Sequence, residues 1–254
     1  MKAARPATII MARTDPMAAT LSSLYQTLSW MSPAWPIGAF AYSGGLERAH
    51  DLGWLPDCAA VGAWLRESLR EGQLRSDAMA FAASHGAMAG SATSLAALAA
   101  MVLAAQAGAE RTLESTAQGS AFRRIAVAAN GDDHPAEIGR YAEALTGIPD
   151  DALPYPVAAA ALFGAFDIAL REALTAFLHG AVSNLVSAAQ RIIPLGHTEA
   201  QRLLVTLQGD VGLARDAAVE MRGAPIDHLL SSATYAADIA CMQHETQYTR
   251  LFRT

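Results

Sequence analysis

The side chains that could carry chemistry are few and scattered in this sequence. Cys241 and His244 stand three positions apart in a segment that fits a helix, and Glu245 follows His244 directly. Residues three apart share one helix face, so this group supplies half of a metal site at most. Glu47 could act as a general base if it were buried. These residues leave one enzyme hypothesis open: an all-helical enzyme that uses Glu47, Cys241 or His244 around an internal pocket.

Other polar groups have simpler interpretations. The loop at residues 130–135 carries an Asp-Asp-His run, which turn chemistry explains better than a metal site. Glu110, Arg111 and Glu114 are spaced for ion pairs along a helix, and we interpret them as a solvated charged face. The sequence has no Gly-x-Ser-x-Gly elbow, phosphate-binding loop or dinucleotide fingerprint. We therefore expect no catalytic residue, no metal site and no cofactor.

Composition and charge set broad limits on function. The 254 residues include 18 basic and 24 acidic side chains, which gives a net charge of −6 without a basic tract. A nucleic-acid ligand is therefore not expected. Only 17% of the residues are charged, against ~25% in an average soluble domain, and much of the apolar excess is alanine, a strong helix former. This composition fits closely packed helices and also surfaces that bind partner proteins.

The cysteine count and the length of the apolar runs predict where in the cell the protein is located. Cys58 and Cys241 are the two cysteines, too few for a disulfide framework, which favours a reducing cytoplasm. The longest apolar runs, 95–105 and 157–166, are shorter than the ~18 residues that a membrane span needs, so we expect a soluble protein without membrane contact. Residues 1–16 do not fit a secretory signal, and we expect a disordered tail there, with translation from Met11 or Met17 as an open alternative.

Helical periodicity dominates the rest of the chain. Apolar residues recur at helical spacing, and no segment alternates apolar and polar residues as a strand would. We predict an all-α fold, with residues 17–254 forming a single-domain helical bundle of roughly ten helices. The predicted helices are 17–30, 40–52, one that opens at Asp57, 76–88, 93–107, 110–129, 135–145, 157–193 and 201–213. The segment 157–193 is the best candidate for the core.

A polar stripe accompanies the apolar face of that central helix. Its members step by four along the chain: Arg171, Thr175, His179, Ser183 and Ser187. A stripe of this kind most often faces solvent, but it can also line a partner surface or an internal passage. We expect solvent here and leave the other two open.

Residues 32–47 interrupt the helical pattern with prolines, glycines and aromatic side chains. Pro33 and Pro36 cannot continue the preceding helix, and each restricts the residue before it to an extended backbone. Gly38 permits a positive φ or a close backbone approach. We expect a shaped turn at this point. A tight inter-helix corner whose aromatic residues pack into the core explains the same pattern equally well.

The C-terminal residues 238–254 have an unusual composition for a chain end. Tyr248, Leu251 and Phe252 stand beside Arg250 and Arg253, the mixture of aromatic residues and arginine that protein interfaces favour. We predict an interaction tail. A final helix that docks on its own domain is the alternative.

The segment 32–47 also resembles the N-terminal signature of the urease accessory protein F (UreF) family, Ser-Pro-x-x-Pro-Val-Gly-x-Phe-Ser-Tyr-Ser-x-Gly-Leu-Glu. The residues that match are Ser32, Pro33, Pro36, Gly38, Phe40, Tyr42, Ser43, Gly45, Leu46 and Glu47. Ile37 and Ala41 depart from it, and Ala41 lacks the usual hydroxyl. The tail resembles the C-terminus of the same family, with departures at Gln243 and Thr249, and further matches lie within 178–204.

This resemblance implies a helical, non-enzymatic chaperone for the delivery of nickel to apo-urease. Members of the family bind an accessory protein called UreD or UreH, recruit the nickel-carrying GTPase UreG, modulate its nucleotide cycle and form homodimers. Nickel is then a delivered ion rather than a cofactor. The residues implied in partner binding are Ser32, Pro33, Pro36, Gly38, Phe40, Tyr42, Ser43, Glu47, His244, Glu245, Thr246, Gln247, Tyr248, Arg250, Leu251, Phe252 and Arg253. A helical scaffold unrelated to nickel would require both end segments to match by accident.

Overall fold

The computed structural model describes residues 16–91, 93–225 and 230–253, and of residues 16–19 only the backbone. Within these ranges the chain forms helices and no strand. The predicted disordered tail lies outside them except for Pro16, where the first helix begins. The α-helices are α1 (Pro16–Trp30), α2 (Leu46–Asp51), α3 (Cys58–Glu71), α4 (Gln73–Met88), α5 (Leu95–Ala104), α6 (Ala109–Asn130), α7 (Pro135–Ala144), α8 (Tyr155–Ala165), α9 (Leu170–Ile192), α10 (His197–Glu220) and α11 (Tyr235–His244). The prediction of an all-helical fold of roughly ten helices is confirmed.

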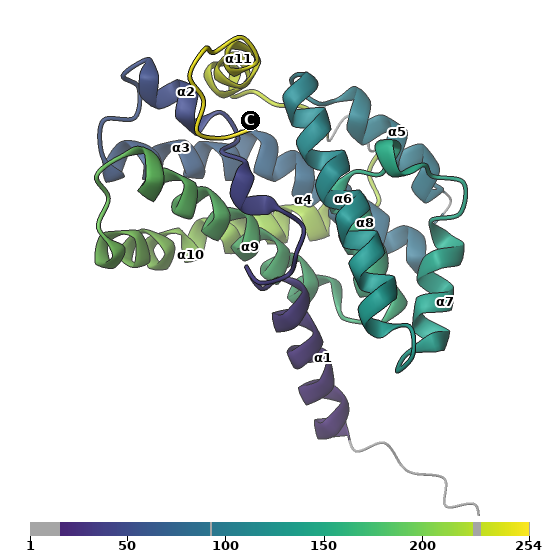
Figure 1. Cartoon of the computed structure of the whole chain (residues 1–254). Coiled ribbons are helices and arrows are strands. Elements are labelled where there is room, and N and C mark those ends of the chain that lie inside the picture. Colours follow the sequence, from purple (N-terminus) through teal and green to yellow (C-terminus); the bar gives the residue numbers. More distant parts are fainter. Residues whose placement is uncertain (1–15, 92, 226–229, 254) are drawn as a thin grey trace, which may run out of the picture.

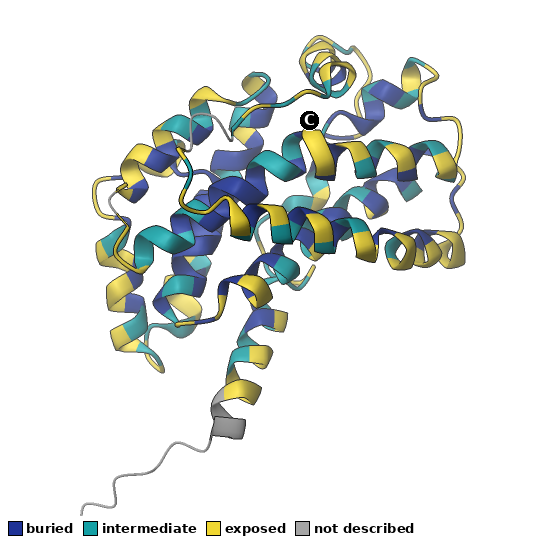
Figure 2. Cartoon of the chain, turned by 180° about the vertical axis from the view of Figure 1, so that it is seen from behind, coloured by how far each residue is buried: buried dark blue, intermediate teal, exposed yellow. Residues whose placement is uncertain are grey.

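The core centres on α8, which packs against α4 and α6, while α9 packs against α10 (Figure 1). Alanine fills five of the eleven positions of α8 and lets its neighbours approach closely, and nearly all of this helix is buried (Figure 2). Aromatic rings complete the interior: the ring centroids of Trp30 and Phe163 lie 5.3 Å apart, and those of Phe81 and Phe177 lie 4.8 Å apart. The core candidate from the sequence is therefore correct in its location.

The short polar residues that open helices act as caps. The carboxylate of Asp57 accepts a hydrogen bond from the backbone N–H of Ala60 at 2.9 Å, where α3 begins. The hydroxyl of Ser94 accepts one from Ala97 at 3.2 Å, where α5 begins. The predicted start of a helix at Asp57 is confirmed.

Three predicted helices are wrong in extent, and the one predicted over 201–213 in fact runs from His197 to Glu220. The helix predicted over 40–52 begins only at Leu46, because Gly44 and Gly45 adopt the left-handed region with φ of 58° and 83°. The segment before them contains a single 3-10 turn, η1 (Ala39–Ala41). The helix predicted over 157–193 is broken between α8 and α9, where Asp167 has a φ of 54°. Apolar periodicity continues on both sides of this break and so conceals it.

Helix α1 projects from the body of the molecule (Figure 1). Its apolar side chains at helical spacing are exposed rather than packed on the core, with Leu21 60% and Tyr25 75% exposed. Only its last turn, which contains Trp30, enters the core. Among the described residues, no helix has the length and apolar character that crossing a membrane requires.

Candidate functional site

The segment 32–47 folds as the shaped turn that its prolines and glycines predict. The hydroxyl of Ser32 accepts a hydrogen bond from the N–H of Ala34 at 3.1 Å, and the Ser32 carbonyl accepts one from Trp35 at 2.9 Å. Gly38 has a φ of 75°, which a glycine adopts without strain. These contacts shape the chain between α1 and η1 without a helix. The shaped turn is confirmed.

Gly45 brings the end of this segment directly against α11. A Cβ atom at Gly45 would lie 3.2 Å from the backbone nitrogen of Cys241, so a larger residue would force the two helices apart. Ser43 is fully buried, and its hydroxyl accepts a hydrogen bond from the N–H of Glu47 at 3.4 Å. Together they fix Glu47 on the side of α2 that faces the C-terminal helix.

His244, the last residue of α11, joins two carboxylates inside the molecule. Its side chain is 0% exposed. Its Nδ1 lies 2.7 Å from Oε2 of Glu110, and its Nε2 lies 3.1 Å from Oε2 of Glu47. A ring nitrogen that carries a proton can donate to a carboxylate oxygen, and each nitrogen of His244 faces one such oxygen. The imidazole ring therefore bridges the two glutamates.

The residues after α11 complete this network. The backbone N–H of Leu251 donates to Oε1 of Glu47 at 2.6 Å, and the N–H of Phe252 donates to Oε2 at 2.9 Å. The guanidinium of Arg250 contacts Oε1 of Glu110 at 2.6 Å. A buried carboxylate is stable only when its oxygens are hydrogen-bonded or ion-paired. We name Glu47, Glu110, His244 and Arg250 the buried clasp, because they fasten the chain end to α2 and α6.

Further contacts surround the buried clasp. Oε1 of Glu245 accepts a hydrogen bond from the N–H of Ala109 at 2.7 Å, at the positive N-terminus of α6. The guanidinium of Arg191 lies 4.2 Å from the ring centroid of Phe252 and donates to the carbonyl of Phe40 at 2.7 Å. The chain end thus packs beside both α2 and the turn that follows α1 (Figure 1).

The interpretation of Glu110, Arg111 and Glu114 as a solvated face is wrong. All three are buried, with exposed fractions of 9%, 6% and 6%. Arg111 pairs with Asp77 of α4 at 2.7 Å and with Glu114 at 2.9 Å. The same spacing of charged residues occurs on exposed and on buried helix faces. Here the residues that pair with this face and bury it, Asp77 and His244, belong to α4 and α11. The sequence carried no signal that would have identified Glu110 or Arg191 as part of this site.

The residues implied by the resemblance fall into two groups. Those that hold the site together are buried: Tyr42, Ser43, Glu47, His244 and Phe252. Burial raises the pKa of the Tyr42 hydroxyl, which stays neutral at physiological pH. The large apolar members that remain on the surface are Phe40 at 71% exposure, Leu251 at 63% and Tyr248, which is fully exposed. Pro33, Pro36, Arg250 and Arg253 are also exposed, whereas Gln247 is half-buried.

The structure gives little support to chemistry at Glu47, Cys241 or His244. Burial raises the pKa of the Cys241 thiol to about 12, whereas a nucleophilic cysteine must be a thiolate. Both ring nitrogens of His244 and both oxygens of Glu47 are engaged in the buried clasp. Among the described residues, no three or more His, Cys, Asp or Glu side chains are placed to hold a metal ion. The absence of a cofactor stays a prediction.

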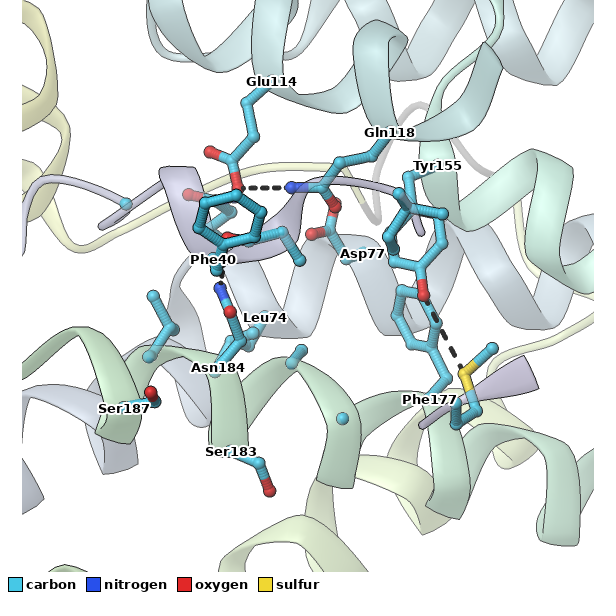
Figure 3. Close-up of a pocket in the computed structure, with 18 of the residues that line it drawn as sticks. Phe40, Leu74, Asp77, Glu114, Gln118, Tyr155, Phe177, Ser183, Asn184 and Ser187 are labelled. Carbon is cyan, nitrogen blue, oxygen red and sulfur yellow. Dashed lines mark hydrogen bonds between the residues drawn. The ribbon is translucent and has the colours of Figure 1, made fainter. Parts of the chain in front are cut away.

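A cavity of about 520 Å³ lies beside the clasp (Figure 3). Its walls come from the turn at 30–40 and from α3, α4, α6, α9 and α11. His179, Ser183 and Ser187 of the polar stripe line it, so the stripe does not face solvent alone. Of the three residues in the enzyme hypothesis, only Cys241 lines this cavity.

Comparisons with known proteins identify the family. A family model described as UreF matches residues 56–208. A urease accessory protein UreF of Rhodopseudomonas palustris strain BisA53 is 40% identical over 245 residues, which cover 95% of this chain and 98% of the relative. The protein of the same name from Bradyrhizobium diazoefficiens is 40% identical over 94% of this chain and 95% of the relative. A third, from Rhodopseudomonas palustris strain BisB5, is 42% identical over 92% of both. The chain therefore belongs to the UreF family of urease accessory proteins, and it is an accessory protein rather than an enzyme.

Proposed function

We propose that this protein is a chaperone for nickel insertion into apo-urease, which bridges a UreD/UreH-type accessory protein and a UreG-type GTPase and modulates GTP hydrolysis. Membership of the UreF family supports the general role, since the relatives are named urease accessory proteins. The bridging, the contact with apo-urease through the complex, a homodimer and a cytoplasmic location belong to the same proposal. So does the division into one helical domain and an interaction tail at about 238–254.

The observation that carries the proposal is the buried clasp itself. It places two segments from opposite ends of the chain side by side, and it leaves Phe40, Tyr248 and Leu251 exposed on them. Exposed aromatic side chains on a fixed backbone are common anchors of a protein interface, because little entropy is lost when they bind, and Leu251 adds exposed apolar area. We name Phe40, Tyr248 and Leu251 the assembly surface.

Helix α11 extends the assembly surface. Tyr235, Ile239 and Met242 are exposed and follow the helical spacing of four and three residues, so they share one face. That face precedes the tail directly, which makes the surface continuous with the residues after His244. We assign the UreD/UreH-type protein to this surface, and the GTPase to the platform that the two proteins form together.

Point variants test this proposal better than deletion of the tail. Deletion of residues 245–254 would remove the two N–H groups that bind Glu47 and the guanidinium that binds Glu110, so the chain could fail to fold for that reason alone. The double variant Tyr248→Ala with Leu251→Ala keeps these backbone contacts. We expect it to bind the UreD/UreH-type protein at least about tenfold more weakly in calorimetry, the usual effect of losing an interface anchor.

A matched control comes from α10, where Val205 and Leu213 are exposed to a similar degree and lie outside the assembly surface. The variant Val205→Ala with Leu213→Ala should bind as the wild type does. Two measurements test recruitment of the GTPase. Light scattering shows whether the GTPase joins the complex of this protein with the UreD/UreH-type protein, and the rate of GTP hydrolysis with and without that complex shows whether the complex modulates the GTPase. Equal binding by both double variants would overturn the site, and no assembly by the folded wild type would overturn the bridging role.

A further inference from the structure

The cavity beside the buried clasp has the size and the lining of a ligand site. Its volume of about 520 Å³ falls within the range of small-molecule pockets. Figure 3 shows Tyr155 and Phe177 on one side of it, and their ring centroids lie 5.3 Å apart. The aromatic side chains of the wall are those of Trp30, Trp35, Phe40, Trp64, Tyr155 and Phe177. A wall of this kind accommodates an apolar body.

The charged side chains of the wall favour a neutral ligand. Arg111 pairs with Asp77 at 2.7 Å and with Glu114 at 2.9 Å, so these two buried carboxylates already have a cation as partner. The third carboxylate, that of Asp238, is half-buried and therefore partly solvated. An anion would meet three carboxylates against a single guanidinium, and Coulomb repulsion opposes its entry.

Two N–H groups that belong to this wall lack an acceptor. Nε1 of Trp35 and Nε of Arg111 are buried, and neither has a hydrogen-bond partner among the described residues. Arg111 is only 6% exposed, and its two other nitrogens are held by the carboxylates. Buried donors in proteins are nearly always paired, and an unpaired one raises the free energy of the fold. The wall therefore offers donors to a ligand.

The side-chain amides of the same wall are used differently. The amide of Gln118 donates to Oε1 of Glu114 at 3.1 Å, and the amide of Asn184 donates to the carbonyl of Ala39 at 2.9 Å (Figure 3). Both contacts are made within the protein. The unpaired donors of Trp35 and Arg111 are thus a specific feature of this cavity, and what they lack is an acceptor.

We propose that this cavity binds a small neutral molecule with an apolar body and carbonyl oxygen as acceptor, which takes hydrogen bonds from Nε1 of Trp35 and Nε of Arg111. Ketones, esters and amides belong to this class. The aromatic wall contacts the apolar body, and the two N–H groups fix its orientation. A hydrocarbon of the same shape would leave both N–H groups unpaired.

The burial of the two N–H groups favours such a ligand. Neighbouring atoms keep water from them, so the protein gives up no hydrogen bond to water when a carbonyl oxygen arrives, and the new bond contributes more than one exchanged with solvent. Both side chains must turn slightly toward the ligand, a change of rotamer that commonly accompanies binding. The inference concerns the isolated chain and does not depend on its role in urease assembly.

Probes that share one carbon skeleton test the inference. The ketone 4-phenylbutan-2-one and the amide 3-phenylpropanamide carry the carbonyl oxygen, 3-phenylpropan-1-amine is a cation at neutral pH, and 3-phenylpropanoate is an anion. We expect calorimetric titration of the full-length protein to detect the ketone and the amide, with both charged probes binding at least about tenfold more weakly. Binding should also change the tryptophan fluorescence, because three of the four tryptophans line the cavity.

The variant Trp35→Phe removes one donor and keeps an aromatic ring. It should weaken ketone binding about tenfold, since the carbonyl oxygen loses a hydrogen bond in a buried place. Butylbenzene, the hydrocarbon of the ketone's shape, should bind to Trp35→Phe as it does to the wild type. Trp54→Phe, at a tryptophan 42% exposed and outside the wall, is the control and should leave every affinity unchanged. Arg111 is left intact because its replacement would break both ion pairs.

Four results would overturn the inference. They are no binding of the ketone or the amide, a charged probe that binds as tightly as the ketone, ketone binding unchanged in a folded Trp35→Phe variant, and equal losses for the ketone and butylbenzene in that variant. The last result would show that Trp35 only shapes the cavity. Circular dichroism and urea unfolding of each variant establish that it is folded.

Discussion

The imidazole of His244 and the carboxylate of Glu47 are 197 positions apart in the sequence and 3.1 Å apart in the structure. This contact joins the segment after α1 to the end of the chain, and Glu110 of α6 closes it from the other side at 2.7 Å. The exposed residues of the proposed assembly surface are carried by the two segments that this contact unites. Its loss should therefore affect the stability and the position of the chain end together.

Replacement of His244 by alanine should destabilise the fold strongly. It leaves the carboxyl groups of Glu47 and Glu110 buried without the imidazole that they share, and removing one partner from a buried polar network of this kind costs about 3 kcal/mol or more. Urea unfolding measures the loss. Tyr248→Ala, at a fully exposed side chain, is the control and should change the free energy of unfolding by less than about 0.5 kcal/mol. Similar values for the two variants would show that the clasp does not stabilise the fold.

Glu245 should stabilise α6 from outside that helix. Its carboxylate accepts the N–H of Ala109 at 2.7 Å, so Glu245→Ala leaves the first turn of α6 without a cap and should cost about 1 kcal/mol. Glu143→Ala, at an exposed position of α7, serves as the control. If thermal unfolding shifts equally for both, the cap makes no net contribution.

Two glycines should respond to alanine in opposite directions. A Cβ atom at Gly119 of α6 would overlap the backbone carbonyl oxygen of Leu153, and overpacking against backbone should destabilise the protein by about 3 kcal/mol. At Gly139 of α7 nothing lies within 4 Å of the added atom, and alanine should stabilise the helix by about 0.5–1 kcal/mol. Chemical denaturation of both variants tests the pair, and destabilisation by both would contradict the packing argument.

The two cysteines should differ in reactivity. Burial raises the pKa of Cys241 to about 12, so the group stays a protonated thiol at pH 8 and should resist iodoacetamide in the folded protein. Cys58 is partly exposed, with a pKa raised by burial and by Glu199, and should react slowly but faster than Cys241. Mass spectrometry of native and urea-unfolded samples gives both rates. Rapid alkylation of Cys241 in the native state would refute the assignment.

Asp77 should make stability fall as the pH rises. Its pKa is about 6 in the folded protein and near 3.8 in the unfolded chain, so the folded state binds the proton more tightly. The stabilisation is complete below about pH 4 and is lost as the pH passes 6, a change of up to about 3 kcal/mol. Asp77→Asn should remove this component. Urea unfolding of both proteins at pH 4.5 and 7.5 measures the difference, and identical pH dependence would contradict the shift.

Local signals in the sequence were sufficient for much of the fold. Asp57 predicted the start of α3 because a cap acts within its own turn, and Pro33 and Pro36 predicted the end of α1 because proline cannot donate its backbone hydrogen bond. Apolar periodicity gave the wrong helix bounds at two places. The left-handed backbone of Gly44 and Gly45 makes α2 begin later than predicted, and Asp167 divides one long apolar pattern into two helices.

The sequence by itself determined the helical class, the shaped turn and, through matching residues at both ends, the family. Which of those residues are structural and which are exposed was decided only by tertiary structure. Glu110 and Glu114 have the spacing of a solvated face but are buried: Glu110 contacts His244 of α11, and Glu114 pairs with Arg111, which also pairs with Asp77 of α4. Whether a side chain is buried, and which residue it pairs with, depends on contacts between residues more than a hundred positions apart, such as Glu110 and His244. Helical periodicity describes only which residues within a few turns share a face, so it cannot predict such contacts.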